Sequence, residues 1–252
     1  MEVNLKALKK FFEPSLFQHR GHCPICEKAV KFRAKGSWFR DQLLCLSCGS
    51  IPRERALMKV IADHYPNWRK LRIHESSPVE RGASSKLRRQ CSQYTASQYY
   101  PDVTPGQEHQ DSGYRCENLE ALTFMDESFD LFISQDVMEH VLDPAVAFQE
   151  ISRVLKPGGA HIFTAPLVNK VGKTQIRASR NTMGEITLHG EPIYHGNPVD
   201  ANGSLVTIDW GYDIARFILE KAGLSTLIVA IDDIDLGIRA EFIDVLVSIK
   251  DH

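Results

Sequence analysis

The chain has 252 residues, of which 43% are hydrophobic and 25% charged, and its formal net charge is −2. This composition is ordinary for a soluble globular protein, and no apolar run approaches the ~20 residues that cross a bilayer. A membrane-spanning protein is therefore excluded, and the length suits one large α/β domain with a small appendage. Near the start of the sequence, lysines and apolar residues alternate at helical spacing, without the continuous apolar segment of a secretory signal. They predict an amphipathic helix over residues 1–20 and a cytoplasmic location.

Charge is distributed unevenly along the chain. Residues 1–70 contain 14 Lys and Arg against 6 Asp and Glu, whereas the remainder contains 16 against 26. A basic front end on an acidic body is one sign of contact with RNA or another polyanion. The alternative interpretation is a solvated basic surface that serves solubility.

Four of the six cysteines form two Cys-x-x-Cys pairs separated by 18 residues, namely Cys23, Cys26, Cys45 and Cys48. Two such turns present four thiolates in the tetrahedral arrangement that Zn²⁺ prefers. The spacing predicts a zinc ribbon over residues 21–56, in a reducing compartment rather than a disulfide framework. Four thiolates close the coordination shell, so this zinc is expected to be structural. A redox role for either pair is the minor alternative.

Basic and aromatic residues interleave between the two cysteine pairs, at Lys31, Phe32, Arg33, Lys35, Trp38, Phe39 and Arg40. Such a mixture can grip phosphates and stack bases. The same aromatic side chains are also needed as the core of so small a module, and this second interpretation is favoured.

After a connecting helix over residues 57–70, strand and helix patterns alternate through residues 71–252. Strands are expected at 71–74, 94–98, 129–134, 160–165, 226–231 and 242–249, and helices near 84–89, 144–155 and 213–222. Asp143 is the expected N-cap before Pro144, and Pro157-Gly158-Gly159 is expected to stop that helix. Alternation of this kind predicts an α/β fold with a mostly parallel sheet covered by helices on both faces.

The segment from Leu122 to Pro166 contains LTFMDESFD, an EH pair, and RVLKPGG before an apolar strand. In this order of motifs it resembles class I methyltransferases that depend on S-adenosylmethionine (SAM), of the type 11 group. The runs IHESSP, YHGNPVD and WGYDI resemble a bacterial subgroup of methyltransferase-like proteins with a zinc ribbon. The resemblance implies a Rossmann-like sheet with an antiparallel last strand, SAM as cofactor, and methyltransferase activity.

The resemblance also implies which residues would hold SAM. The Gly-rich turn of the family is replaced by His74-Glu75-Ser76-Ser77, with only Gly82 left, and either His74 or Glu75 holds the place of the motif acid. The ribose position falls on Ser97 or Gln98, where the family has an acid. The remaining implied cofactor contacts are Glu117, Asn118, Leu119, Ser134 and Gln135.

Substrate-covering residues are expected in a long insertion, residues 167–211, which is rich in Gly, Pro, His and Asn. His195 is the first candidate for general base, because imidazole takes up a proton near neutrality. Asp136 and His140, at an expected helix start, are the second candidates. Arg177 and Arg180 would hold an anionic substrate group, and Tyr194 and Asn197 flank the proposed base.

Three functions follow from these features. The leading prediction is methyl transfer to a small-molecule or glycan-precursor acceptor, at oxygen. The second is an RNA methyltransferase that uses residues 1–70 for RNA recognition. The third is a non-catalytic protein that keeps the methyltransferase fold for binding. No membrane partner is expected, and the sequence does not indicate an oligomeric state.

Overall fold

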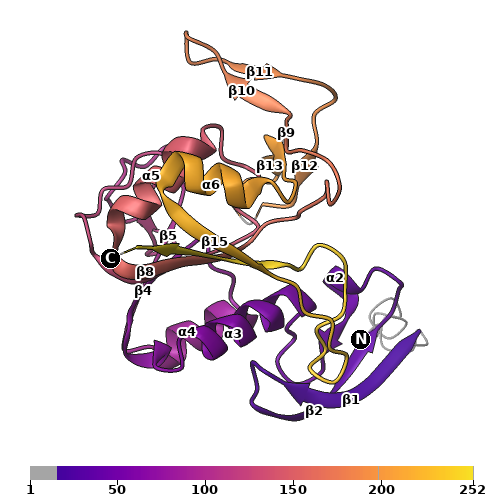
Figure 1. Cartoon of the computed structure of the whole chain (residues 1–252). Helices are drawn as coiled ribbons and strands as arrows, with labels where there is room; N and C mark the ends of the chain where they lie inside the picture. Colours follow the sequence, from indigo (N-terminus) through magenta and orange to yellow (C-terminus); the bar gives the residue numbers. More distant parts are fainter. Residues whose placement is uncertain (1–15, 198, 252) are drawn as a thin grey trace, which may run out of the picture.

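The computed structural model describes residues 16–197 and 199–251 (Figure 1). Its centre is a seven-stranded sheet with the order β15-β16-β8-β7-β4-β5-β6. The strands are β4 (Arg72–Ser76), β5 (Gln93–Gln98), β6 (Arg115–Cys116), β7 (Phe129–Gln135), β8 (Leu155–Thr164), β15 (Leu224–Val229) and β16 (Val245–Lys250). The five strands from β4 to β8 are parallel, while β16 runs antiparallel to both of its neighbours. The expected Rossmann-like sheet with an antiparallel last strand is confirmed.

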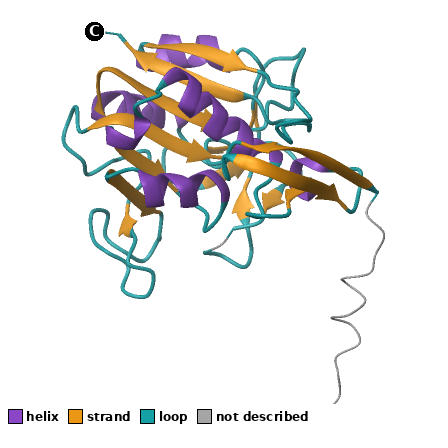
Figure 2. Cartoon of the chain, turned by 90° about the horizontal axis from the view of Figure 1, so that it is seen from below, coloured by secondary structure: helices purple, strands orange, loops and turns teal. Residues whose placement is uncertain are grey.

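Helices cover both faces of the sheet (Figures 1 and 2). One face carries α3 (Pro52–His64) and α4 (Gly82–Gln90), and the other carries α5 (Pro144–Val154) and α6 (Ile214–Ala222). Successive side chains of a strand point to opposite faces of the sheet. Apolar side chains of β7 therefore pack against helices on both faces. Leu131 and Ile133 join the core under α3, whereas Phe132 joins the core under α5.

Helix α5 begins as the sequence predicts but ends earlier. The Asp143 carboxylate caps it by accepting a hydrogen bond from the Val146 amide at 3.1 Å, and Pro144 occupies the first turn. The last helical residue is Val154, and β8 starts at Leu155. Pro157-Gly158-Gly159 therefore lies inside the strand rather than stopping the helix, where the pairing with β7 shifts register between Phe129 and Leu131.

The first described residues form a small antiparallel sheet, which together with its loops we call the cysteine module (residues 17–51). It contains β1 (Phe17–Cys23), β2 (Lys28–Ala34), the short helix α2 (Phe39–Gln42) and β3 (Leu44–Cys45). The expected amphipathic helix falls mostly on residues 1–15, outside the described residues. Residues 17–20 belong to β1, which is paired in register with β2, so that helix does not extend to residue 20.

The expected connecting helix over 57–70 is placed too late. Helix α3 already starts at Pro52, whose fixed φ suits a first helical turn, and it ends at His64. A 3₁₀ helix, η1 (Trp68–Lys70), then leads into β4. The earlier start has a local cause, because the buried Glu54 side chain accepts a hydrogen bond from the Ile51 amide at 3.0 Å.

The cysteine module packs on the α/β domain rather than standing apart from it. The buried Arg55 guanidinium donates to the carbonyls of Leu43 and Ser50 in the module and of Gly237 in the loop before β16. The same loop approaches β1 so closely that a Cβ on Gly21 would lie 2.0 Å from the Asp235 carbonyl oxygen. Module and domain thus share one continuous hydrophobic core.

The insertion over residues 167–211 folds into short pairs of strands beyond the carboxyl end of β8 (Figure 1). These are β9 (Gln175–Ile176) with β14 (Ile208–Asp209), β10 (Ala178–Arg180) with β11 (Ile186–Leu188), and β12 (Tyr194–His195) with β13 (Ser204–Leu205). Across the described ranges, no helix combines the length and the apolar character that a membrane span requires.

Candidate functional site

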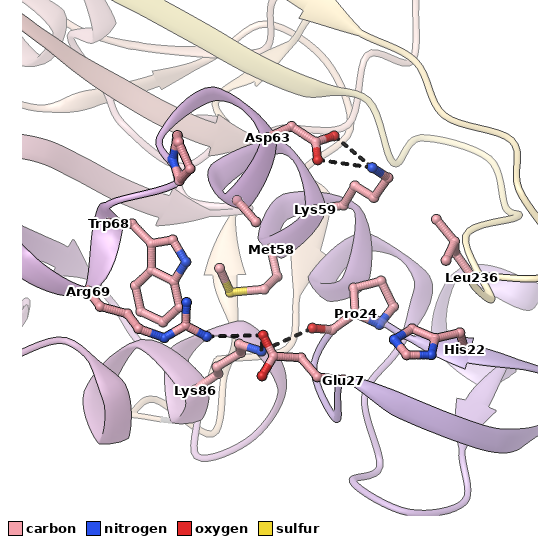
Figure 3. Close-up of a pocket in the computed structure, with 12 residues that line it drawn as sticks. His22, Pro24, Glu27, Met58, Lys59, Asp63, Trp68, Arg69, Lys86 and Leu236 are labelled. Carbon is pink, nitrogen blue, oxygen red and sulfur yellow. Dashed lines mark hydrogen bonds and ion pairs between the residues drawn. The ribbon is translucent and has the colours of Figure 1, made fainter.

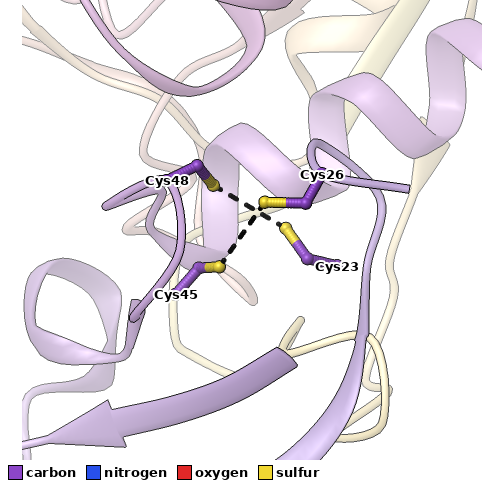
Figure 4. A group of neighbouring side chains, drawn as sticks. All are labelled: Cys23, Cys26, Cys45 and Cys48. Carbon is purple, nitrogen blue, oxygen red and sulfur yellow. Dashed lines mark hydrogen bonds between the residues drawn. The ribbon is translucent and has the colours of Figure 1, made fainter. Parts of the chain in front are cut away.

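The four paired cysteines converge on one point (Figure 4). The sulfurs of Cys23 and Cys48 are 3.9 Å apart, and those of Cys26 and Cys45 are 3.8 Å apart. In a tetrahedral site with Zn–S bonds of about 2.3 Å, neighbouring sulfurs lie about 3.8 Å apart, so the cluster has the size of a zinc site. Gly49, directly after the second cysteine pair, has a φ of 70°.

A surface pocket of about 450 Å³ lies between the cysteine module and helix α3 (Figure 3). Its charged groups pair with one another: Glu27 lies 2.8 Å from the Lys86 ammonium and 3.0 Å from the Arg69 guanidinium. Lys86 is buried and also donates to the carbonyls of Pro24 and Ile25 at 3.2 Å. We assign these contacts to docking of the module, because they join its first cysteine turn to α4.

The loop that follows β4 is polar and organised. Glu75 is fully buried, and it accepts hydrogen bonds from Ser84 at 2.6 Å, Tyr94 at 2.8 Å and Gln135 at 3.0 Å. Burial raises the pKa of the Glu75 carboxyl, although all three hydrogen bonds oppose that rise. Ser77, two residues further along the chain, has a φ of 55°. That left-handed conformation favours glycine, so the chain keeps a glycine-like turn at this point without a glycine.

Two of the expected cofactor contacts are core residues instead. His74 points to the opposite face of the sheet, where its ring nitrogens lie 2.9 Å from the hydroxyls of Thr95 and Ser97. Burial lowers the pKa of His74 to about 3. Both His74 and Ser97 are thus enclosed and hydrogen-bonded inside the protein, which leaves Glu75 and Gln98 as the candidates for the motif acid and the ribose contact.

The cofactor contacts expected further along the sheet also divide into buried residues and one half-buried residue. Glu117 is buried and held by Arg115 and Thr123, and Leu119 is part of the core under α5. Asn118 is half-buried, and its side-chain oxygen accepts from the Glu120 amide at 2.9 Å. This hydrogen bond uses the side-chain oxygen of Asn118 and not its amide N–H groups.

Ser134 and Gln135 end β7 on opposite faces. The Ser134 hydroxyl lies 3.0 Å from Nε2 of the buried His161, which places it in the core. Gln135 donates to Glu75 and Ser84 at 3.0 Å, while its buried Oε1 has no hydrogen-bond partner within the described chain. An unpaired acceptor beside a carboxylate fits a ligand ammonium group, such as that of the methionine part of SAM.

Asp136 follows directly, in a strained turn with a φ of 52°. Its carboxylate lies 2.6 Å from the guanidinium of Arg40, 3.1 Å from that of Arg53, and 2.9 Å from the Thr164 hydroxyl. Burial favours the neutral acid, but the two guanidinium groups hold the pKa of Asp136 below its usual value. A carboxylate held in this way is a poor proton acceptor, which argues against Asp136 as a general base.

Glu139 and His140 lie in the turn before α5, not at a helix start as expected. The Glu139 carboxylate is buried, and neither oxygen has a hydrogen-bond partner in the described residues. Burial and the Asp136 charge raise the pKa of Glu139 well above its usual value. His195, on β12, meets His140 edge to face with ring centroids 5.2 Å apart. Burial lowers the pKa of the His140 imidazole, and partial burial lowers the pKa of His195, whose side chain is otherwise exposed.

Three of the four remaining residues expected at the substrate have partners in the protein. Arg177 lies 2.9 Å from Asp209 and donates to the Glu191 carbonyl, and Arg180 lies 3.1 Å from Glu120. The Asn197 amide bonds to the Ser204 hydroxyl at 2.8 Å, and Tyr194 is 55% exposed. Arg177 therefore joins two parts of the insertion, and Arg180 joins the insertion to the segment between β6 and β7.

Glu139, Arg40 and Arg53 also belong to this region, although the sequence did not predict them there. The neighbouring acid and histidine at 139 and 140 were visible as part of a motif, but only the fold shows that the acid is buried and unpaired. The two arginines come from the module and from α3, so no local pattern connects them to Asp136. Of the expected aromatic core of the module, Phe32 is fully buried whereas Trp38 is 44% exposed.

A family described as a methyltransferase domain matches residues 81–163, which hold α4, β5, β6, β7, α5 and most of β8. This part of the chain is therefore similar to a methyltransferase domain. Among solved structures, Burkholderia thailandensis 1,6-didemethyltoxoflavin-N1-methyltransferase with bound S-adenosylhomocysteine aligns with a TM-score of 0.51. That alignment covers 79% of this chain and 79% of the other, at 12% identity, and the likeness is one of fold.

Two curated proteins are similar to parts of this chain. The Ubiquinone biosynthesis O-methyltransferase of Parvibaculum lavamentivorans is 41% identical over 54 residues, 21% of each chain. The Dimethylglycine N-methyltransferase of Parasynechococcus marenigrum is 44% identical over 50 residues, 20% of this chain and 18% of that one. The chain thus spans about a fifth of the length of these curated relatives.

Proposed function

We propose that the protein is a SAM-dependent methyltransferase that acts on a small molecule and methylates an oxygen atom. The observation that carries the proposal is the buried acceptor Oε1 of Gln135, unpaired in the described chain, beside Glu75 and the left-handed turn at Ser77. These groups lie at the carboxyl ends of parallel strands, where open α/β sheets bind ligands.

When bound, SAM would supply an activated methyl group on its sulfonium. The residues of this chain would bind and orient it. Glu75 and Gln135 would face the amino-acid end, while Gln98 and Asn118 would face the ribose and the adenine. Transfer from a sulfonium needs alignment of the acceptor more than covalent help. Asp136 would act as a positioning residue that fixes the turn between β7 and the acceptor side.

A small-molecule acceptor is supported by the names of the relatives, one of which is an O-methyltransferase and another an N-methyltransferase of dimethylglycine. The preference for oxygen and the glycan-precursor class stay predictions from the sequence. So does the cytoplasmic location, with which the six free cysteines agree. In the cysteine module we propose a structural Zn²⁺ held by Cys23, Cys26, Cys45 and Cys48, because their spacing matches tetrahedral thiolate coordination.

Titration calorimetry with SAM and S-adenosylhomocysteine tests the cofactor assignment. The wild type is expected to bind both nucleosides, and Gln135→Leu is expected to weaken binding at least tenfold, because it removes the unpaired acceptor. Gln149→Leu is the matched control, since Gln149 lies exposed on α5, where its side chain donates to the Lys221 carbonyl. A folded wild type that binds neither nucleoside at millimolar concentration would indicate a non-catalytic protein instead.

A further inference from the structure

Three metal-ligating side chains meet beside the proposed acceptor side. Glu139, His140 and His195 each offer one ligand atom, and these atoms all lie within 4.8 Å of one another. The His140 Nε2 atom is 3.9 Å from a Glu139 oxygen. Glu139 is only 2% exposed, and neither of its carboxylate oxygens accepts a hydrogen bond within the described chain. A buried carboxylate in this condition is costly unless a cation pairs with it.

The surrounding backbone holds these side chains in place. The Thr207 amide and hydroxyl both donate to the Glu139 carbonyl, at 2.8 and 3.1 Å. Nδ1 of His140 lies 2.8 Å from the Leu205 carbonyl oxygen, which can only accept, so Nδ1 carries the proton. Nε2 of His140 therefore presents a free electron pair toward Glu139. Fixing the far ring nitrogen on a carbonyl is the usual support for a metal-binding histidine.

In the described part of the chain, neither neighbouring arginine forms an ion pair with Glu139. Arg40 and Arg53 lie close by, but their guanidinium groups are directed at Asp136, at 2.6 and 3.1 Å. His195 approaches Glu139 and His140 from the insertion, where it pairs with Ser204 across the β12–β13 hairpin. One ligand therefore comes from the insertion and two from the turn after β7, so an ion would link the two segments.

We propose that Glu139, His140 and His195 bind a divalent first-row transition-metal ion. Two imidazoles and one carboxylate suit such ions, and three protein ligands leave coordination positions open for the oxygen atoms of a bound molecule. This assignment replaces the proton-accepting role expected for His195, because a nitrogen that holds a metal ion has no free electron pair. That the open positions hold the acceptor oxygen is a further step, and it rests on the proposed methyltransferase function.

Manganese binding to the full chain tests the site directly. Protein carrying one equivalent of zinc is titrated with Mn²⁺, and the signal of free Mn²⁺ is followed by electron paramagnetic resonance. Mn²⁺ prefers oxygen and nitrogen ligands, so it does not compete for the four cysteines. We expect one Mn²⁺ per chain in the wild type. Glu139→Gln, which keeps the side-chain shape, and His195→Ala are each expected to weaken Mn²⁺ binding at least tenfold.

His189→Ala is the matched control, because His189 lies exposed in the same insertion and its ring nitrogen is 2.8 Å from the Ser179 hydroxyl. It should bind Mn²⁺ as the wild type does. The proposal fails if the wild type binds neither Mn²⁺ nor Co²⁺ beyond the cysteine site, or if Glu139→Gln binds Mn²⁺ unchanged. If Glu139→Gln does not fold, His195→Ala decides, since His195 is exposed. No SAM is present, so this outcome is independent of the nucleoside titration.

Discussion

The guanidinium of Arg40, in the cysteine module, lies 2.6 Å from the carboxylate of Asp136, at the carboxyl end of β7. Arg40 also donates to the Phe242 carbonyl in the loop before β16. The Arg40 side chain is 11% exposed and the Asp136 side chain is 16% exposed, so solvent screens the ion pair only in part. The module is therefore connected to the turn that carries Glu139 and His140. Loss of this connection is expected to disturb the structure of the proposed acceptor side.

Replacing Arg40 should destabilise the protein and loosen that turn. Arg40→Ala removes one of two guanidinium partners and leaves a largely buried carboxylate with less compensation, so we expect a loss of about 1–3 kcal/mol in the free energy of unfolding. Urea denaturation followed by tryptophan fluorescence measures the change. Lys59→Ala is the control, because it breaks an exposed pair with Asp63 on α3 and should leave the stability nearly unchanged. Equal stability of Arg40→Ala and the wild type would contradict the proposed coupling.

Metal removal should unfold more than the module. The buried residues around the four cysteines belong to the same hydrophobic core as α3 and the sheet. Since so small a module has little core of its own, metal binding supplies folding free energy. Chelation, or the substitution Cys45→Ser, is expected to abolish the bound zinc and to lower the melting temperature of the whole chain.

Elemental analysis and calorimetry measure these two effects together. Cys91→Ser is the matched control, because Cys91 is a buried cysteine outside the cluster whose sulfur bonds to the Leu71 carbonyl. It should keep one zinc per chain. Loss of zinc from Cys45→Ser without any change in melting temperature would show that the module contributes nothing to the stability of the domain.

The sequence predicted those elements whose signals are local. Asp143 and Pro144 mark the start of α5, and the apolar run at 129–134 marks the central strand β7, as the structure confirms. The prediction that the paired cysteines cluster similarly depends on their spacing alone. By contrast, the partners of a strand residue depend on which face it occupies, and one position of shift reverses them. His74 and Glu75 are adjacent, yet one is a core residue and the other faces α4.

The proposed metal site could not be predicted for a related reason. Glu139 and His140 are neighbours in the chain, but His195 joins them only through the fold of the insertion and the pairing of β12 with β13. Burial of Glu139 without a hydrogen bond within the described chain is also a property of packing. A motif can thus name the residue types of a site, whereas distances between segments decide which of them act together.

Two buried histidines should make the protein sensitive to mild acid. Burial lowers the pKa of His74 and of His161 to about 3. Below the usual histidine pKa of about 6.5, the unfolded chain binds a proton at each position that the folded protein does not. Stability should therefore fall as the pH decreases from about 6.5 toward 3, by about 1.4 kcal/mol per pH unit for each histidine.

His161→Phe isolates one of these protons. His161 stacks on Phe163 with ring centroids 4.2 Å apart, so a phenyl ring fits the same aromatic contacts. At neutral pH the variant should lose about 1 kcal/mol, because the buried Ser134 hydroxyl loses its partner. Its stability should then fall less steeply with acid than that of the wild type. Parallel slopes in urea denaturation between pH 6.5 and 5 would contradict the neutral, buried state of His161.

In the turn after β4, Ser77 occupies a backbone conformation that favours glycine, which should lower the free energy of unfolding. Ser77 holds a φ of 55°, a conformation that costs a residue with a Cβ of order 1 kcal/mol and glycine far less. Ser77→Gly should therefore be tolerated, with S-adenosylhomocysteine bound as tightly as in the wild type or more so. Ser77→Val should lower the free energy of unfolding by at least about 1 kcal/mol and weaken that binding, because a β-branched residue resists this conformation most. Equal nucleoside affinity in all three proteins, measured by calorimetry, would mean that this turn does not approach the ligand.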